Sequence, residues 1–205
     1  KGNLQMNPAM LFSIGLVSTF ITGGLTGLIL GDSALDINVH DTYFVVAHFH
    51  LVMGISALYG LFAGVYHWFP KMFGRMMDET LGKIHFWGTI IPFNGIFLPL
   101  FLVGMAGQHR RIYNFQHFPD LATADLQGIR VFATVSMVTM LLFQFVFAYN
   151  FFVSMFKGEK APANPWKSNT LEWTVPSPPP HGNFAELPTC LLYTSDAADE
   201  PLSGV

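Results

Sequence analysis

The sequence predicts an all-α fold, a polytopic membrane bundle of four transmembrane helices. Asp, Glu, Lys and Arg together make up only 11% of the 205 residues, against roughly a quarter in an ordinary soluble domain. Four runs contain none of these residues, and they cover residues 2–31, 42–70, 84–109 and 131–156. Each run exceeds the roughly 20 mostly apolar residues that a helix needs to cross a bilayer. The distribution of charge therefore predicts a membrane protein.

Each run predicts one span. The first span covers about residues 8–30, where Gly23, Gly24 and Gly27 would allow a neighbouring helix to approach closely. An acidic connector at 32–41 leads to the second span, about residues 42–69. We expect this second span to end at Pro70, because proline cannot donate the next helical hydrogen bond.

The remaining two spans lie on either side of a polar loop. The third span, about residues 84–107, contains Pro92 and Pro99, which we expect to kink the helix. The fourth span covers about residues 129–156. A proline-rich tail, residues 157–189, follows it and cannot continue the helix.

The basic residues predict the orientation of the bundle. An even number of spans places both termini on one side, and seven Lys or Arg residues lie on that side. The opposite side has three, namely Arg110, Arg111 and Arg130. By the positive-inside rule, both termini face the cytoplasm of a bacterial plasma membrane, or the matrix at a mitochondrial inner membrane.

Several classes of function are excluded by composition. The formal net charge is −3, and no basic patch indicates a nucleic-acid partner. The single cysteine, Cys190, excludes an internal disulfide and all cysteine-based metal motifs. The chain begins at Lys1 with no initiator methionine and no signal peptide, so we interpret it as an internal piece of a longer protein.

Two histidines in the second span are the first candidate functional residues. His48 and His50 lie roughly 9 to 12 Å along the helix from Thr42, and ionisable residues at that depth usually have a function. Helical residues two positions apart are rotated by about 200°, so these imidazoles cannot chelate one metal together. They could instead serve two haems, one on each side of the helix, with Phe49 between them. The alternatives are hydrogen bonds to neighbouring helices, or a proton or substrate path.

Charged residues on the outer side favour the haem interpretation. Asp36, His40 and Asp41 lie just before the second span, and Arg110 and Arg111 lie just after the third. Paired arginines bind carboxylates such as haem propionates by bidentate hydrogen bonds. His40 and Asp41 offer a nitrogen and a carboxylate to a divalent ion. The competing interpretations are interfacial anchoring by the arginines and capping of the second span.

A longer motif surrounds these residues. The string His40-Asp41-Thr42-Tyr43-Phe44-Val45-Val46-Ala47-His48-Phe49-His50 resembles the signature of subunit I of the haem-copper oxidases, most closely its cytochrome c oxidase branch. Further matches in order and spacing are Asn7-Pro8-Ala9-Met10, Gly23-Gly24-Leu25-Thr26-Gly27, His67-Trp68-Phe69-Pro70, Lys83-Ile84-His85-Phe86 and Arg110-Arg111. The resemblance covers residues 2–189 and implies the last four of twelve helices.

The resemblance implies a role for each candidate residue. His48 would be the proximal ligand of the oxygen-binding haem, and His50 an axial ligand of the low-spin haem. His40 and Asp41 would hold magnesium or manganese, completed by subunit II. Asp36, Arg110 and Arg111 would lie around the haem propionates, and Phe49 would separate the haem edges; the full set is His48, His50, His40, Asp41, Asp36, Arg110, Arg111 and Phe49.

The resemblance also implies cofactors, partners and a reaction. Two haems, of A type, would pass electrons from cytochrome c to oxygen, forming water and driving a proton pump in aerobic respiration. Copper would be bound in the parent enzyme by histidines upstream of Lys1, so we expect this chain alone to be inactive. The partners would be oxidase subunits II and III and the membrane lipid.

Three alternatives remain open. A quinol oxidase of the same superfamily would share the histidines, although its relatives commonly have asparagine at the position of Asp41. A cofactor-free transporter could use His48 and His50 as a proton relay. The third alternative is that the chain is a fragment that is translated but never assembled.

A few residues depart from the family pattern or lie outside it. Gln108 and His109 stand where relatives often have Met-Pro, which affects the loop before the paired arginines. We expect His67 and His85 to pack near the membrane interface. Residues 190–205 have an abrupt acidic, small-residue composition, and we interpret them as a non-native read-through tail.

Overall fold

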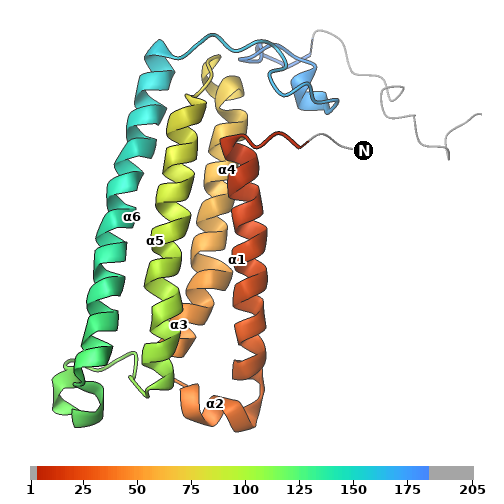
Figure 1. Cartoon of the computed structure of the whole chain (residues 1–205). Coiled ribbons are helices and arrows are strands. Elements are labelled where there is room, and N and C mark those ends of the chain that lie inside the picture. Colours follow the sequence, from red (N-terminus) through yellow and green to blue (C-terminus); the bar gives the residue numbers. More distant parts are fainter. Residues whose placement is uncertain (1–3, 185–205) are drawn as a thin grey trace, which may run out of the picture.

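The computed structural model describes residues 4–184, which form a bundle of long helices lying side by side (Figure 1). Within this part of the chain, four helical stretches are long and apolar enough to cross a membrane: Pro8–Gly31, Tyr43–Phe73, Glu79–Met105 and Ala124–Lys157. The predicted all-α class and the four predicted spans are therefore confirmed. The predicted read-through tail at 190–205 lies outside the described residues.

The second span consists of three consecutive helical pieces. The long helices are α1 (Pro8–Gly31), α5 (Glu79–Met105) and α6 (Ala124–Lys157), while the second span runs through α3 (Tyr43–Phe49), the π-helical turn η1 (His50–Gly54) and α4 (Ile55–Phe73). A π-helical turn has one extra residue per turn and is frequent at functional sites. No feature of the sequence predicted it.

Short elements close the ends of the bundle. The acidic connector at 32–41 contains a helix, α2 (Ser33–Val39), which lies across one end of the bundle (Figure 1). Asp32 begins α2, since its side chain accepts a hydrogen bond from the backbone N–H of Ala34 at 2.9 Å. The remaining elements are the 3₁₀ turns η2 (Phe115–His117), η3 (Pro119–Leu121) and η4 (Leu171–Trp173).

The helices extend beyond the predicted spans because capping residues determine their ends. Asp78 accepts a hydrogen bond from the N–H of Leu81 at 2.7 Å, so α5 begins at Glu79 and not near residue 84. The expected end at Pro70 is wrong, because the helix continues to Phe73. Gly74 ends it with a left-handed φ of 65°, and its N–H donates to the carbonyl of Pro70 at 2.8 Å.

An aromatic core joins α1, α4 and α5. Phe12 of α1 is completely buried, and its ring contacts those of Tyr59, Tyr66 and Phe86. His85, near the start of α5, also lies in this core and is completely buried. Its two ring nitrogens lie 3.1 Å from the hydroxyl of Tyr66 and 3.2 Å from the side-chain carbonyl oxygen of Gln144, so the buried imidazole is hydrogen-bonded on both sides.

Candidate functional site

The site begins with the imidazole of His48, which α1 holds through hydrogen bonds. Its Nδ1 lies 3.0 Å from the carbonyl oxygen of Gly23 and 2.9 Å from the hydroxyl oxygen of Thr26. A carbonyl oxygen can only accept, so Nδ1 carries the hydrogen. In a neutral imidazole, Nε2 then has the lone pair that binds a metal.

Glycines on α1 make this contact possible. A Cβ on Gly27 would lie 3.0 Å from Cε1 of His48, and a Cβ on Gly23 would lie 2.8 Å from Cβ of Leu51. Both distances are too short for a side chain to fit without movement of its neighbours. Gly23 and Gly27 therefore bring α1 against the histidine and against η1, as predicted, whereas a Cβ on Gly24 would meet nothing within 4 Å.

His50 is held differently. Its Nδ1 donates to the carbonyl oxygen of Val46, one turn earlier in its own helix, at 2.8 Å. Its ring stacks on Phe97 of α5, with ring centroids 4.5 Å apart and planes 19° apart, and Phe49 lies on it at 4.6 Å. Because the carbonyl of Val46 can only accept, Nδ1 of His50 carries the hydrogen. The lone pair of the neutral imidazole therefore lies on Nε2.

The two imidazoles therefore contact different helices, which is the arrangement expected from their spacing. Among the hydrogen bonds of residues 4–184, none uses Nε2 of His48 or of His50. Both residues and the intervening Phe49 are only partly buried, so each Nε2 remains available to a further group. One helix thus carries two imidazoles that contact different neighbouring helices, and the chemistry of each Nε2 would allow it to bind a metal.

The π-helical turn begins at His50 and changes the backbone directly behind both histidines. Ser56 compensates for the altered hydrogen bonding, because its hydroxyl donates to the carbonyl of Leu51 at 2.8 Å. The same hydroxyl lies 3.4 Å from that of Thr19 on α1. The turn is thus stabilised by side chains from its own helix and from α1.

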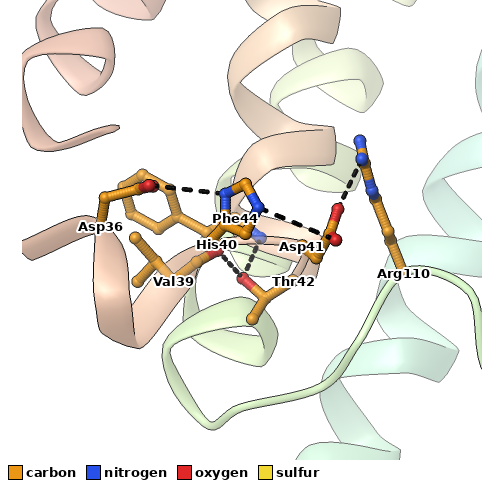
Figure 2. Close-up of polar contacts among 7 residues, drawn as sticks. All are labelled: Asp36, Val39, His40, Asp41, Thr42, Phe44 and Arg110. Atoms are coloured by element: carbon orange, nitrogen blue, oxygen red, sulfur yellow. Dashed lines mark hydrogen bonds and ion pairs between the residues drawn. The ribbon is translucent and has the colours of Figure 1, made fainter. Parts of the chain in front are cut away.

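The loops at the α2 end of the bundle place Asp41 at the centre of a charged cluster (Figure 2). Asp41 has a left-handed backbone, with φ of 57°, which Asp and Asn tolerate better than other side chains do. Its carboxylate lies 2.5 Å from Nη2 of Arg110 and 3.9 Å from Nε2 of His40. Nδ1 of His40 lies 3.4 Å from the carboxylate of Asp36.

Backbone hydrogen bonds hold Arg110 beside Asp41. The N–H of Tyr43 donates to the carbonyl of Gln108, and the N–H of Arg110 donates to the carbonyl of Asp41, both at 3.0 Å. Thr42 pairs with His109 between them. The Gln108-His109 departure from the family pattern therefore lies in a segment whose backbone is paired with the start of α3.

The charge of Asp41 is stabilised by its neighbours. Desolvation on its own would raise the pKa of Asp41. The positive charge and hydrogen bond of Arg110, with smaller effects of His40 and Arg111, outweigh it and hold the pKa of that carboxyl below its ordinary value. Asp41 therefore remains ionised in neutral solution.

The guanidinium of Arg110 has one buried nitrogen without a partner among the described residues. Its Nε is buried and has no hydrogen-bond partner among the described residues, although its Nη2 is paired with Asp41. Arg111 is exposed beside it. A buried guanidinium nitrogen without a partner is costly, so this position suits an acceptor that the described residues do not supply.

The fold and the site define a class of protein, an integral membrane helix bundle with two imidazoles on one helix whose Nε2 atoms have no hydrogen-bond partner among the described residues, and a charged cluster at one end. The comparisons with known proteins agree. A family model described as Cytochrome C and Quinol oxidase polypeptide I matches residues 1–139. The chain belongs to this family, the large subunit of haem-copper oxidases, as the resemblance predicted.

Individual relatives are consistent with this result. The chain is 46% identical over 187 residues to cytochrome c oxidase subunit 1 of Synechocystis, covering 91% of this chain and 33% of the relative. It is 40% identical over 197 residues to alternative cytochrome c oxidase subunit 1 of Bradyrhizobium diazoefficiens, covering 95% of this chain and 33% of the relative. The chain thus spans about a third of the length of the curated relatives it matches.

The family implies haem and copper, and the described residues fit haem. Each histidine presents Nε2 with Nδ1 donated to a carbonyl, the usual state of an iron-ligating imidazole. The unpaired Nε of Arg110 suits a propionate. Within residues 4–184 there is no group of three or more His, Cys, Asp or Glu side chains placed to hold a metal ion.

Proposed function

We propose that the chain forms part of the catalytic subunit of a cytochrome c oxidase and ligates the iron of both haems. His48 would ligate the oxygen-binding haem, and His50 the low-spin haem. The observation that carries this proposal is the pair of Nε2 lone pairs, each set by an Nδ1–H donated to a carbonyl, on rings that contact different helices. A carbonyl that accepts a hydrogen bond from Nδ1 orients a ligating imidazole and raises its basicity.

The proposed reaction is the reduction of oxygen to water with electrons from cytochrome c, coupled to proton pumping in aerobic respiration. Both haems would be of A type. When bound, their irons supply reversible one-electron chemistry. The chain's own residues hold and orient these groups, and Phe49 separates them. The copper ligands would come from outside this chain, so we expect the chain alone to be inactive.

The outer cluster would bind the haem propionates and a divalent ion. Arg110 has a buried unpaired Nε and Arg111 is exposed beside it, which supports propionate binding by these two residues with Asp36 nearby. His40 Nε2 and Asp41 Oδ2 are 3.9 Å apart, and this nitrogen and this carboxylate would contribute to holding a magnesium or manganese ion. We propose that subunit II completes that shell.

The proposal also includes an electron donor, partner subunits and an orientation in the membrane. Asp41 favours cytochrome c over quinol, because quinol-oxidising relatives commonly have asparagine at this position. Subunits II and III would be partners within the complex. With seven basic residues on the side of the termini and three on the other, both termini would face the cytoplasm of a bacterial plasma membrane or the mitochondrial matrix.

Haem content tests the ligand assignment. In the full-length parent complex, His48→Ala should abolish oxygen reduction and the optical signature of the oxygen-binding haem while the low-spin haem persists. His50→Ala should remove the low-spin haem. The measurements are extraction and mass of the haems, optical difference spectra, and oxygen consumption with reduced cytochrome c.

A surface histidine provides the control. His117 is exposed in η2, away from α3, and His117→Ala should leave both haems and turnover unchanged. Normal turnover of His48→Ala would refute the ligand assignment. Absence of haem from the parent complex itself would favour the proton-relay transporter.

A further inference from the structure

We propose that Thr26 is a positioning residue for His48, and that its hydroxyl increases the electron donation of the ligating Nε2. The inference rests on the proposed function, since it concerns the iron ligand assigned there. Two acceptors on α1, the backbone carbonyl of Gly23 and the hydroxyl of Thr26, lie within hydrogen-bonding distance of Nδ1 of His48.

The direction of each hydrogen bond follows from the chemistry of the groups. The hydroxyl of Thr26 lies 2.7 Å from the carbonyl of Gly23 and donates its single hydrogen there. Its oxygen then presents lone pairs to Nδ1 of His48 at 2.9 Å. Nδ1–H is therefore shared between the hydroxyl of Thr26 and the carbonyl of Gly23.

The opposite arrangement is unfavourable. If Thr26 donated to Nδ1, that nitrogen would carry no hydrogen, and its 3.0 Å contact with the Gly23 carbonyl would join two acceptors. Nε2 would then be protonated and unable to bind iron. The triangle formed by Gly23, Thr26 and His48 is consistent with only one tautomer, the one that ligation requires.

Two acceptors also fix the plane of the ring. A single acceptor would leave the imidazole free to pivot about one hydrogen bond, whereas acceptors at Gly23 and Thr26 hold it from two directions. Gly27 admits the ring edge, since a Cβ there would lie 3.0 Å from Cε1. The direction in which Nε2 points, and from which it would bind iron, is therefore set by α1.

The two histidines differ in this respect. His50 donates Nδ1–H to the carbonyl of Val46 in its own helix, and no side-chain hydroxyl shares that bond among the described residues. Stronger hydrogen bonding at Nδ1 raises the basicity of Nε2 and favours the oxidised iron. Removal of the Thr26 hydroxyl should therefore affect the oxygen-binding haem selectively.

The experiment uses Thr26→Val in the full-length parent complex, because valine keeps the shape and removes the hydroxyl. We expect the iron–histidine stretching frequency of the reduced oxygen-binding haem to fall and its midpoint potential to rise. The potential of the low-spin haem should not change. Thr26→Ser should restore both values, since serine retains the hydroxyl.

A matched control lies one turn away on α1. The hydroxyl of Thr22 is exposed and donates to the carbonyl of Ser18 at 2.8 Å. Thr22→Val removes a hydroxyl from the same helix without contact with His48. It should leave the frequency and both potentials unchanged.

Each outcome decides between the proposals. Thr26→Ala is a second variant without the hydroxyl. If a haem-loaded Thr26→Val or Thr26→Ala complex keeps the wild-type iron–histidine frequency and midpoint potential, the proposed role of Thr26 is overturned and the ligand assignment stands. Loss of haem from both variants with retention in Thr26→Ser supports the hydroxyl as the positioning group. Absence of an iron–histidine band in the wild type, or its persistence in His48→Ala, overturns the proposed function itself.

Discussion

Asp41 combines three properties that few other residues could supply together. Its backbone is left-handed, with φ of 57°, its carboxylate pairs with Arg110, and it also faces His40 (Figure 2). Asparagine tolerates the same backbone conformation but lacks the charge. The charge and the backbone requirement can therefore be separated by a single substitution.

Asp41→Asn tests the proposed divalent site at the scale of one residue. The substitution removes the anionic oxygen that would bind the ion, and in the full-length parent complex we expect manganese affinity to fall by at least about tenfold, because ligand-sphere changes have effects of that size. Electron paramagnetic resonance after growth in manganese measures the bound ion. Asp32→Asn is the control, because asparagine also caps α2. Unchanged manganese in Asp41→Asn would refute the site.

Individual candidate residues could be identified from the sequence where the chemistry is local. His48 and His50 were found by their depth in a charge-free span, and His40, Asp41 and Arg110 by their motif. Thr26 and the Gly23 carbonyl were not predicted as partners of His48, because they lie 22 and 25 residues away and the contact depends on how α1 packs against α3. The nearby glycines indicated close approach but not its partner.

At the scale of elements, the junction of α3 and α5 depends on a glycine. A Cβ on Gly104 would lie 2.7 Å from Cα of Phe44 and closer still to its backbone nitrogen. The backbone there cannot yield easily, because Tyr43 is hydrogen-bonded to Gln108 at 3.0 Å. This close approach brings the loop that follows α5, with Arg110, beside Asp41.

Gly104→Ala should therefore separate α3 from α5. We expect a loss of about 1–3 kcal/mol, the usual cost of overpacking, measured as a lower Tm of the parent complex and a weaker binding of manganese. Gly128→Ala is the matched control, because a Cβ on Gly128 meets nothing within 4 Å. An unchanged Tm in Gly104→Ala would mean that the two helices can move apart without cost.

The elements differ in how far the sequence predicts them. The four spans follow from the lack of charge, but α2 was missed because it is short and polar, and helix ends were missed because capping by Asp78 and Thr123 extends α5 and α6. The π-helical turn at His50 has no compositional signal. It depends on hydrogen bonding by Ser56 and on contact with α1.

At the scale of the whole molecule, the segment after α6 returns to cover the far end of α4, opposite the charged cluster (Figure 1). Trp166 donates to the carbonyl of His67 at 3.0 Å, and their rings stack with planes 15° apart. Trp173 is 2% exposed beneath Lys71, whose ammonium lies 4.8 Å from the ring centroid. Residues far apart in sequence thus contact one another at this end of the bundle.

Lys71→Met tests whether the side chain of Lys71 holds the segment around residues 171–176 against α4. The ammonium donates to the carbonyls of Val175 and Pro176 at 2.7 and 3.3 Å, and charged hydrogen bonds contribute about 2 kcal/mol. We expect amide exchange around residues 171–176 of the parent complex to accelerate about thirtyfold. Lys83→Met is the control, because Lys83 pairs with exposed Glu79 on its own helix and such pairs contribute little. Equal exchange in both variants would show that the tryptophans alone hold the segment.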